Sequence, residues 1–158
     1  MTKAPLGGEA TGSNPTDRGK KGTKRSVLTD GNGIPLSITV AGANAHDCTI
    51  LIDTLRAISI EPPIPTKDAF QHLCLDKGYD YGFVQEIALD FGYTPHIRTR
   101  GEEKQEKQAG KKPRRWVVER THSWINRFRR LLIRWEKKQG NYLALLQLAA
   151  FLITYNQT

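Results

Sequence analysis

The sequence contains few cysteines and no long apolar run. Cys48 and Cys74 are the only cysteines, and neither belongs to a CxxC pair. Their apolar neighbours predict buried, reduced thiols in a cytosolic protein, which excludes a disulfide-rich secreted fold. The most apolar stretch, residues 142–155, is too short to span a bilayer and contains Gln147, so it is typical of a buried core helix. The polar, basic start does not resemble a signal peptide.

Acidic residues are also scarce. The chain has 24 Lys and Arg against 16 Asp and Glu, giving a net charge of +8 and a pI near 9.7. Such a balance favours a polyanionic partner, either nucleic acid or an anionic membrane surface. A basic protein without an anionic partner remains an alternative on composition alone. The length of 158 residues, 38% hydrophobic and 25% charged, fits one globular domain.

Alternating strand and helix patterns predict an α/β domain. Residues 1–21 are rich in Gly, Pro and Lys and predict a flexible basic entry segment, with the domain proper over residues 22–158. The break Asp30-Gly31-Asn32-Gly33 predicts a hairpin between strands at 23–29 and 34–40. The remaining elements follow in order: a helix at 48–58, a strand at 72–75, a helix at 81–91, a strand at 93–100, a mobile loop at 101–112, a helix at 113–138, and a final apolar helix after Gly140. Together they predict a mixed sheet covered by helices.

The predicted helix at 113–138 has two distinct faces. An apolar stripe at helical spacing favours packing of both its tryptophans on a core: Val117, Thr121, Trp124, Phe128, Leu131 and Trp135, widened by Ile125 and Leu132. The opposite face is strongly basic, and between Arg114 and Arg134 seven arginines are opposed only by Glu119. Arginines in such a run are typical of phosphate contacts, because the guanidinium matches phosphate oxygens bidentately.

Two acids stand in positions that suit chemistry. Asp76 directly follows an apolar strand, and ligands gather beyond the carboxyl ends of strands in α/β sheets. Glu119 lies in the middle of the basic face. Ordinary interpretations exist for both, because Asp76 would also cap the next helix and Glu119 would pair with Arg115 one turn earlier. Carboxylates on a basic surface suit Mg²⁺-assisted phosphodiester transfer, in which acids hold the metal and arginines hold the DNA backbone.

Several motifs in series resemble a known family. ATGSNPTDRGKKGTKRSVLTDGNGIPL, ANAHD, HLCLDKGYD and RRWVVERTHSWINRFRRLLIRWE are similar to the catalytic part of bacterial insertion-sequence DDE transposases of the IS-four/IS-five superfamily. The resemblance runs from about Lys3 to Tyr155. It implies a ribonuclease-H-like mixed sheet flanked by helices, two Mg²⁺ or Mn²⁺ ions in a complete site, and metal-dependent cleavage and strand transfer at element ends.

The resemblance also assigns residues by position. Asp76 matches the second acid of the catalytic and metal-binding triad, and Glu119 matches the third. Arg115 matches the arginine of the Tyr-Arg-Glu-Lys signature, whereas Lys112 stands at its tyrosine and Asn126 at its lysine. The DNA-binding set expected on this helix is Arg115, Arg120, Asn126, Arg127, Arg129, Arg130 and Arg134.

One member of the triad has no match. The family carries its first acid on the first strand, shortly before a segment like the one that begins here at Lys3. Asp17, Asp30 and Asp47 are poor substitutes, since they lie in a loop, a hairpin turn and a helix cap. The expectation is therefore that the first strand is missing or incomplete in this chain.

Two functions follow from this resemblance. The first is DNA transposition by a catalytic domain lacking its first acid; the second is a non-catalytic DNA-binding remnant or regulator. Both predict double-stranded DNA as partner, namely terminal inverted repeats and target DNA, with no membrane and a cytoplasmic, nucleoid-associated location. A homodimer in the DNA complex is compatible with the need to bring two ends together.

Overall fold

The structure is a computed structural model that describes residues 1–60, 62–97 and 115–157, without the side chain of Arg115. It divides into two compact units. Unit 1 comprises Met1–Ser59 and Val117–Thr158, and unit 2 comprises Ile60–Trp116. Glu119 therefore belongs to unit 1 and Asp76 to unit 2, and each unit is described by itself below.

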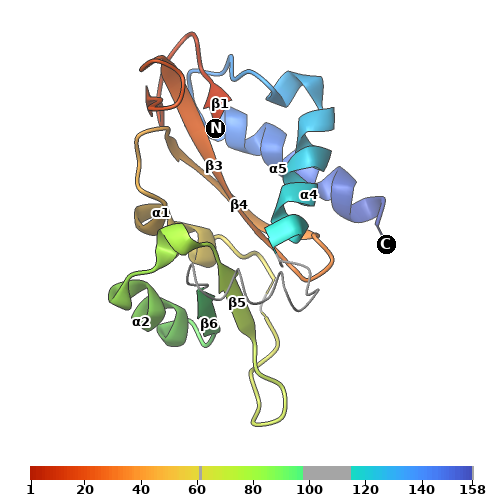
Figure 1. The fold of residues 1–158 in the computed structure, drawn as a ribbon. Coiled ribbons are helices and arrows are strands. Elements are labelled where there is room, and N and C mark those ends of the chain that lie inside the picture. Colours follow the sequence, from red (N-terminus) through yellow and green to blue (C-terminus); the bar gives the residue numbers. More distant parts are fainter. Residues whose placement is uncertain (61, 98–114, 158) are drawn as a thin grey trace, which may run out of the picture. The chain divides into compact units, whose positions relative to one another are not determined.

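A long antiparallel hairpin organises unit 1 (Figure 1). Strands β3 (Lys21–Thr29) and β4 (Pro35–Gly42) pair in register from Thr23 opposite Gly42, and the predicted hairpin is confirmed. Asp30 fixes the turn, because its Oδ1 accepts the backbone N–H groups of Asn32 at 2.9 Å and Ile34 at 2.8 Å. Gly33 completes it with a φ of +83°, a conformation that favours glycine.

The predicted entry segment contributes to the same sheet. Two short strands, β1 (Thr2–Lys3) and β2 (Gly12–Ser13), pair antiparallel with the start of β3, and both meet Gly22. Backbone bonds from Ala4 to Lys21 and from Asn14 to Lys20 continue this attachment. Residues 1–21, predicted as an irregular entry, therefore form two short strands and their connecting turns at the start of β3.

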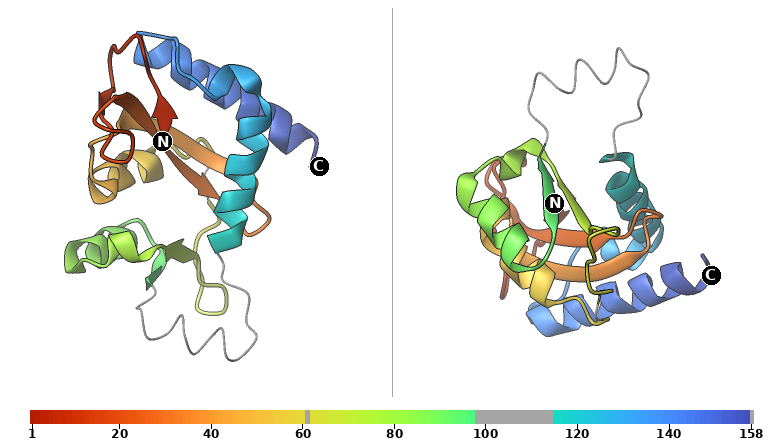
Figure 2. Two further views of the ribbon diagram at one scale, coloured as in Figure 1. Left: turned by 45° about the horizontal axis from the view of Figure 1, so that its top comes forward. Right: turned by 90° about the horizontal axis from the view of Figure 1, so that it is seen from below.

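Helices cover both faces of the hairpin. Helix α1 (Asp47–Arg56) lies on one face, where Thr54 accepts from Ser37 and its hydroxyl donates to Ser26 at 2.8 Å. Helices α4 (Arg115–Arg127) and α5 (Gln139–Tyr155) lie on the other face (Figure 2). There the buried side chains of both helices pack on the hairpin and form the main core: Ile38, Val40, Ile125, Leu131, Tyr142, Leu146, Ala149 and Ile153.

The predicted helix at 113–138 is wrong in its second half. Helix α4 ends at Arg127, because Phe128 adopts an extended backbone with a ψ of 93°, and only a short 3-10 turn, η2 (Arg129–Leu131), follows. The chain then runs beside β1, where the N–H of Arg134 donates to the carbonyl of Lys3 at 2.8 Å. Trp135 and Leu132 consequently leave the predicted core stripe and are exposed. Gly140, predicted as a breaker, lies inside α5.

Arg134 is buried in this connection, with 1% of its surface exposed. Its Nη1 donates to the carbonyl of Ala10 at 3.1 Å and the hydroxyl of Thr23 at 2.7 Å, and its Nε donates to the carbonyl of Glu136 at 2.9 Å. The guanidinium also lies over the ring of Tyr142, 5.3 Å from its centroid. The helical pattern predicted that Arg134 lies on an exposed DNA-binding face. This prediction is wrong because α4 ends before Arg134.

Unit 2 contains a strand–helix–strand crossover. Strand β5 (His72–Leu75) leads through a 3-10 turn, η1 (Lys77–Tyr79), to helix α2 (Gly82–Asp90) and then to β6 (Thr94–Ile97), which pairs parallel with β5. Gly92 ends α2 with a φ of +79°, as predicted. Cys74 is exposed on β5, so the prediction of two buried thiols holds only for Cys48.

The described helices are too short or too polar to be membrane spans. Among residues 1–60, 62–97 and 115–157, no helix has both the length and the apolar character needed to cross a bilayer.

We expect Arg134→Ala to lower the free energy of unfolding by about 2–4 kcal/mol, because it leaves buried carbonyl and hydroxyl acceptors without their donor. Urea titration followed by circular dichroism measures this. Arg129→Ala, at an exposed position in the same connection, is the matched control and should change stability by less than about 0.5 kcal/mol. Equal stability of the two variants would contradict the role given to Arg134.

Candidate DNA-binding and metal-binding site

Glu119 is exposed and lies on the face of α4 that is turned away from the core. The helix is held on the hairpin turn by Thr121, which is fully buried and whose hydroxyl donates to the carbonyl of Gly33 at 2.6 Å. Because Thr121 faces inward, Glu119 two residues earlier projects outward. The predicted orientation of this acid, away from the apolar stripe, is therefore confirmed.

Arg25 and Glu119 both lie close enough to His122 to influence its pKa. Arg25 projects from β3 and donates through Nη2 to the side-chain oxygen of Asn126 at 2.9 Å. His122 lies one turn after Glu119, and burial lowers its pKa to about 4, reinforced by the charges of Arg25 and the Met1 amino group and opposed by Glu119. His122 is thus a neutral donor or acceptor at pH 7.

Two members of the predicted DNA-binding set have partners within unit 1. Arg120 donates to the carbonyl of Asn32 in the hairpin turn, and its guanidinium lies 5.0 Å from the ring centroid of Trp124. Asn126 accepts from Arg25. These side chains connect α4 to the hairpin, so their first role is to fix the helix on the sheet.

Two other members are exposed and have no partner in the part of the chain that the structure describes. Arg127 and Arg129 are exposed, and neither has an ion pair or a hydrogen bond from its side chain to any residue that the structure describes. Arg130 is exposed as well and forms an ion pair with Glu136. Arg115 begins α4, but its side chain lies outside the described residues, as do Lys112 and the loop predicted at 101–112.

Asp76 ends β5 in unit 2, as predicted for an acid at the carboxyl end of a strand. Its Oδ1 accepts the backbone N–H of Gly78 at 2.8 Å, so the carboxylate also caps η1. This single bond orients the group, and its second oxygen has no hydrogen-bond or ion-pair partner among the described residues. Both interpretations of Asp76, capping residue and site residue, are compatible with this geometry.

The three other aspartates considered for the first acid are engaged elsewhere. Asp17 lies 3.6 Å from the ammonium group of Lys3, and Asp47 lies 3.0 Å from that of Lys24. Asp30 holds the hairpin turn. None of these three joins a group of acids, since the described parts of the chain contain no cluster of three or more His, Cys, Asp or Glu arranged to hold a metal ion.

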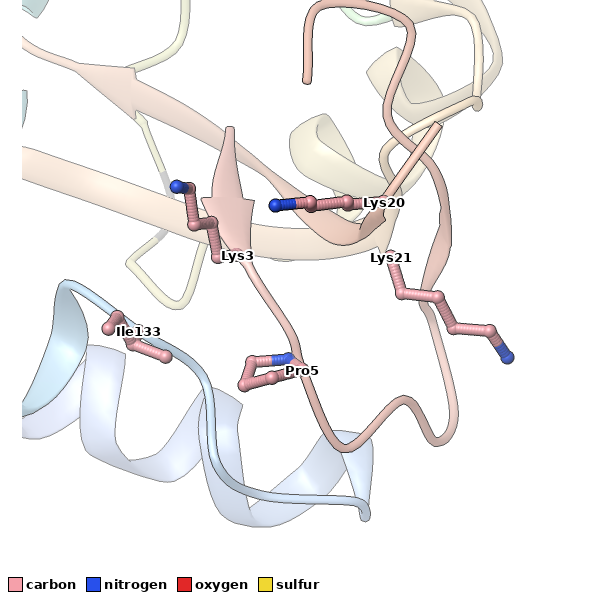
Figure 3. Close-up of a pocket in the computed structure, with 5 residues that line it drawn as sticks. All are labelled: Lys3, Pro5, Lys20, Lys21 and Ile133. Atoms are coloured by element: carbon pink, nitrogen blue, oxygen red, sulfur yellow. The ribbon is translucent and has the colours of Figure 1, made fainter. Parts of the chain in front are cut away.

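Unit 1 has a second basic feature, which was not predicted from the sequence. Lys3, Lys20 and Lys21 surround a pocket of about 430 Å³ whose remaining lining is apolar, formed by Pro5 and Ile133 (Figure 3). The side chain of Lys20 extends toward Lys3, whereas that of Lys21 points away. Lys20 and Lys21 have no acidic partner among the described residues. The lysines in and next to KGTKR are visible in the sequence, but only the pairing of β1 with β3 brings Lys3 close to them.

Comparison with known proteins decides the family. The profile described as "Transposase DDE domain" matches residues 2–156, nearly the whole chain. The chain belongs to the DDE transposase family. It is also 40% identical over 152 residues to a Burkholderia cepacia protein named "Putative transposase for insertion sequence element IS402", covering 92% of this chain and 69% of that protein. No solved structure matches the chain.

Membership of the DDE transposase family implies the general chemistry of this domain. DDE transposases carry out DNA transposition by nucleotidyl transfer and generally use divalent metal ions. The donors found here fit such ions, because Asp76 and Glu119 supply exposed carboxylate oxygens, which hard cations prefer. Glu119 lies in unit 1 and Asp76 in unit 2, and each is described within its own unit.

His122 makes the stability of the transposase domain depend on pH. Its folded pKa of about 4 lies below the ordinary value of 6.5, so the unfolded chain binds the proton more readily. The resulting stabilisation is present above pH 6.5 and is lost as the pH falls toward 4. We expect His122→Asn to remove roughly 1–3 kcal/mol of this pH-dependent difference, measured by urea unfolding at pH 7 and pH 4.5. An unchanged difference between the two pH values would contradict it.

Proposed function

We propose that Asp76 and Glu119 are metal-holding acids of this transposase domain, and that Arg127, Arg129 and Arg130 contact the phosphates of the DNA it acts on. The observation that carries the proposal is the basic end of α4. Arg127 and Arg129 are exposed cations without acidic partners among the described residues; Arg127 ends the helix that carries Glu119, and Arg129 begins the 3-10 turn that follows it. A DNA backbone would supply the missing negative charges.

The two carboxylates have different surroundings. Asp76 is oriented by the N–H of Gly78, which leaves one oxygen directed to other partners. Glu119 is presented by a helix whose inner side is fixed through Thr121 and Arg120 to the hairpin turn. Divalent ions bound by such acids would activate an attacking oxygen and stabilise the leaving oxygen of a phosphodiester. The protein's own contribution is to hold both acids on rigid elements and to bind the phosphates beside them.

We also propose a ribonuclease-H-like arrangement for the whole domain. The supporting features are an antiparallel hairpin with helices on both faces, and a parallel strand–helix–strand crossover that ends its first strand in Asp76. In the structure the two form separate sheets, a four-stranded antiparallel one in unit 1 and a two-stranded parallel one in unit 2; the proposed arrangement would join them in one mixed sheet, in which a parallel pair requires a crossover helix such as α2.

The basic pocket is proposed as an additional phosphate contact. Lys3, Lys20 and Lys21 all line the pocket, although the side chain of Lys21 points away from the other two, and among the described residues only Lys3 has a nearby carboxylate, Asp17. Ile133 links this pocket to the end of α4, because it lies four residues after Arg129 and bridges to Lys3. Arginines and lysines therefore continue from α4 to the start of β3 on unit 1.

We expect Asp76→Asn and Glu119→Gln each to weaken Mn²⁺ binding at least about 10–100-fold, because each removes an anionic oxygen ligand. Electron paramagnetic resonance of free Mn²⁺ measures the affinity, and nicking of terminal-repeat DNA in Mg²⁺ measures the chemistry. Asp80→Asn, an acid four residues from Asp76, is the matched control and should bind Mn²⁺ as the parent does. Parent-like binding by both test variants would refute the assignment; DNA binding without nicking by the parent would favour the regulator.

We expect Arg127→Ala/Arg129→Ala to weaken duplex DNA binding and to reduce the slope of log K against log salt by about two, one for each lost phosphate contact. Lys20→Ala/Lys21→Ala should act in the same way through the pocket. Fluorescence anisotropy at several salt concentrations measures the slopes. Arg56→Ala, an exposed arginine at the end of α1, is the control. If a double variant has the same salt slope as the control, the phosphate contacts proposed for its two residues are contradicted.

A further inference from the structure

Helix α5 carries two apolar stripes on opposite sides. One stripe is buried against the hairpin and α4: Tyr142, Leu146, Ala149 and Ile153. The other stripe is exposed and lies half a helical turn away: Ala144, Leu148, Phe151 and Tyr155. Figure 2 shows α5 at the rim of unit 1, with the hairpin along one of its sides. The second stripe is not needed to attach α5 to its own sheet.

The exposed stripe is large for a surface helix. Leu148 is 56% exposed, Phe151 64% and Tyr155 71%, and Leu152 beside them is 36% exposed. Taking about 200–250 Å² for a fully exposed large side chain, these residues offer roughly 500 Å² of mainly apolar surface. Patches of this size mark interaction sites on soluble proteins. The rings of Phe151 and Tyr155 stack with centroids 6.4 Å apart, which holds them in a defined arrangement.

The helix that carries the stripe has no charged side chain. Residues 139–158 contain no Asp, Glu, Lys or Arg, although the chain as a whole carries a net charge of +8. A charged partner such as DNA or an anionic membrane finds no complementary group on this surface. A surface of the same uncharged, apolar character is the complement that the stripe fits, and α5 itself has that character.

The spacing of the stripe is the same in both directions. The steps from Ala144 to Leu148, to Phe151 and to Tyr155 are four, three and four residues. Such a spacing suits a two-fold symmetric contact between antiparallel helices, in which residue i of one copy meets residue j of the other and j meets i, because every residue of the stripe then meets another residue of the stripe. Sizes match as well: the small Ala144 meets the large Tyr155, and Leu148 meets Phe151.

We propose that α5 is a self-association surface that pairs antiparallel, through its exposed stripe, with α5 of a second copy of this chain. The pairing goes beyond the proposed function, since it involves neither the acids nor the basic residues and needs no DNA. Stable dimers bury about 800 Å² on each partner, so the roughly 500 Å² of this stripe predicts a weak dimer that dissociates on dilution.

Sedimentation velocity of the full chain without DNA tests the association. We expect the weight-average mass to rise above 17.8 kDa toward twice that value with concentration. Phe151→Glu and Leu148→Glu should each keep the chain monomeric at every concentration, because each places a charge opposite an apolar side chain. Leu89→Glu, at a residue 61% exposed on α2, is the matched control and should leave the association unchanged. A monomeric parent, or loss of association in the control as well, would overturn the proposal.

Cross-linking tests the direction of the pairing. In a Cys74→Ser background, Ala144→Cys and Tyr155→Cys are prepared separately and treated with a short bis-maleimide, alone and mixed. Antiparallel pairing predicts severalfold more cross-linked dimer in the mixture than in either variant alone, because Ala144 meets Tyr155 of the second copy while identical residues lie about 16 Å apart along the helix. Equal cross-linking by Ala144→Cys alone would overturn the antiparallel arrangement. Because neither experiment contains DNA or metal, its failure is distinguishable from failure of the proposed function.

Discussion

The buried guanidinium of Arg134 is the interaction on which the rest of unit 1 depends. It binds the carbonyl of Ala10 in the N-terminal segment, the hydroxyl of Thr23 in β3 and the carbonyl of Glu136 before α5, and it lies over Tyr142 of α5. Two segments more than 100 residues away, the neighbouring connection and α5 therefore share one cation. A buried charge is tolerated only when its donors are satisfied, so all four segments must be in place together.

The attachment at Arg134 also determines which residues are available to DNA. Since the chain has to leave the helical path after Arg127 to bring Arg134 under the N-terminal segment, the basic run is divided into two parts. Arg120 and Asn126 serve the contact between α4 and the hairpin, and Arg134 serves the core. Arg127 and Arg129 keep their side chains in solvent. One arginine-rich stretch thus supplies both the structural bonds of the domain and its exposed cations.

Prediction from the sequence succeeded where the signal was local. The Asp30–Gly33 turn, the strand ending in Asp76 and the glycine end of α2 each depend on a few adjacent residues, and each is present. The outward direction of Glu119 followed from helical periodicity alone. The end of α4 was not predicted because neither Phe128 nor Arg129 is a helix-breaking residue. The break results from the pairing of residues near Ile133 with β1.

The sequence by itself determined the family, the hairpin, the crossover, the strand-end place of Asp76 and the outward direction of Glu119, because motifs in series and short-range patterns carry that information. Only the tertiary structure decided which cations are buried, which are paired and which are exposed. A guanidinium's role depends on the dielectric and the acceptors around it, and these come from segments far apart in the chain. For the same reason the lysine pocket and the outer stripe of α5 became visible only when β1 had paired with β3 and the inner stripe had packed on β4.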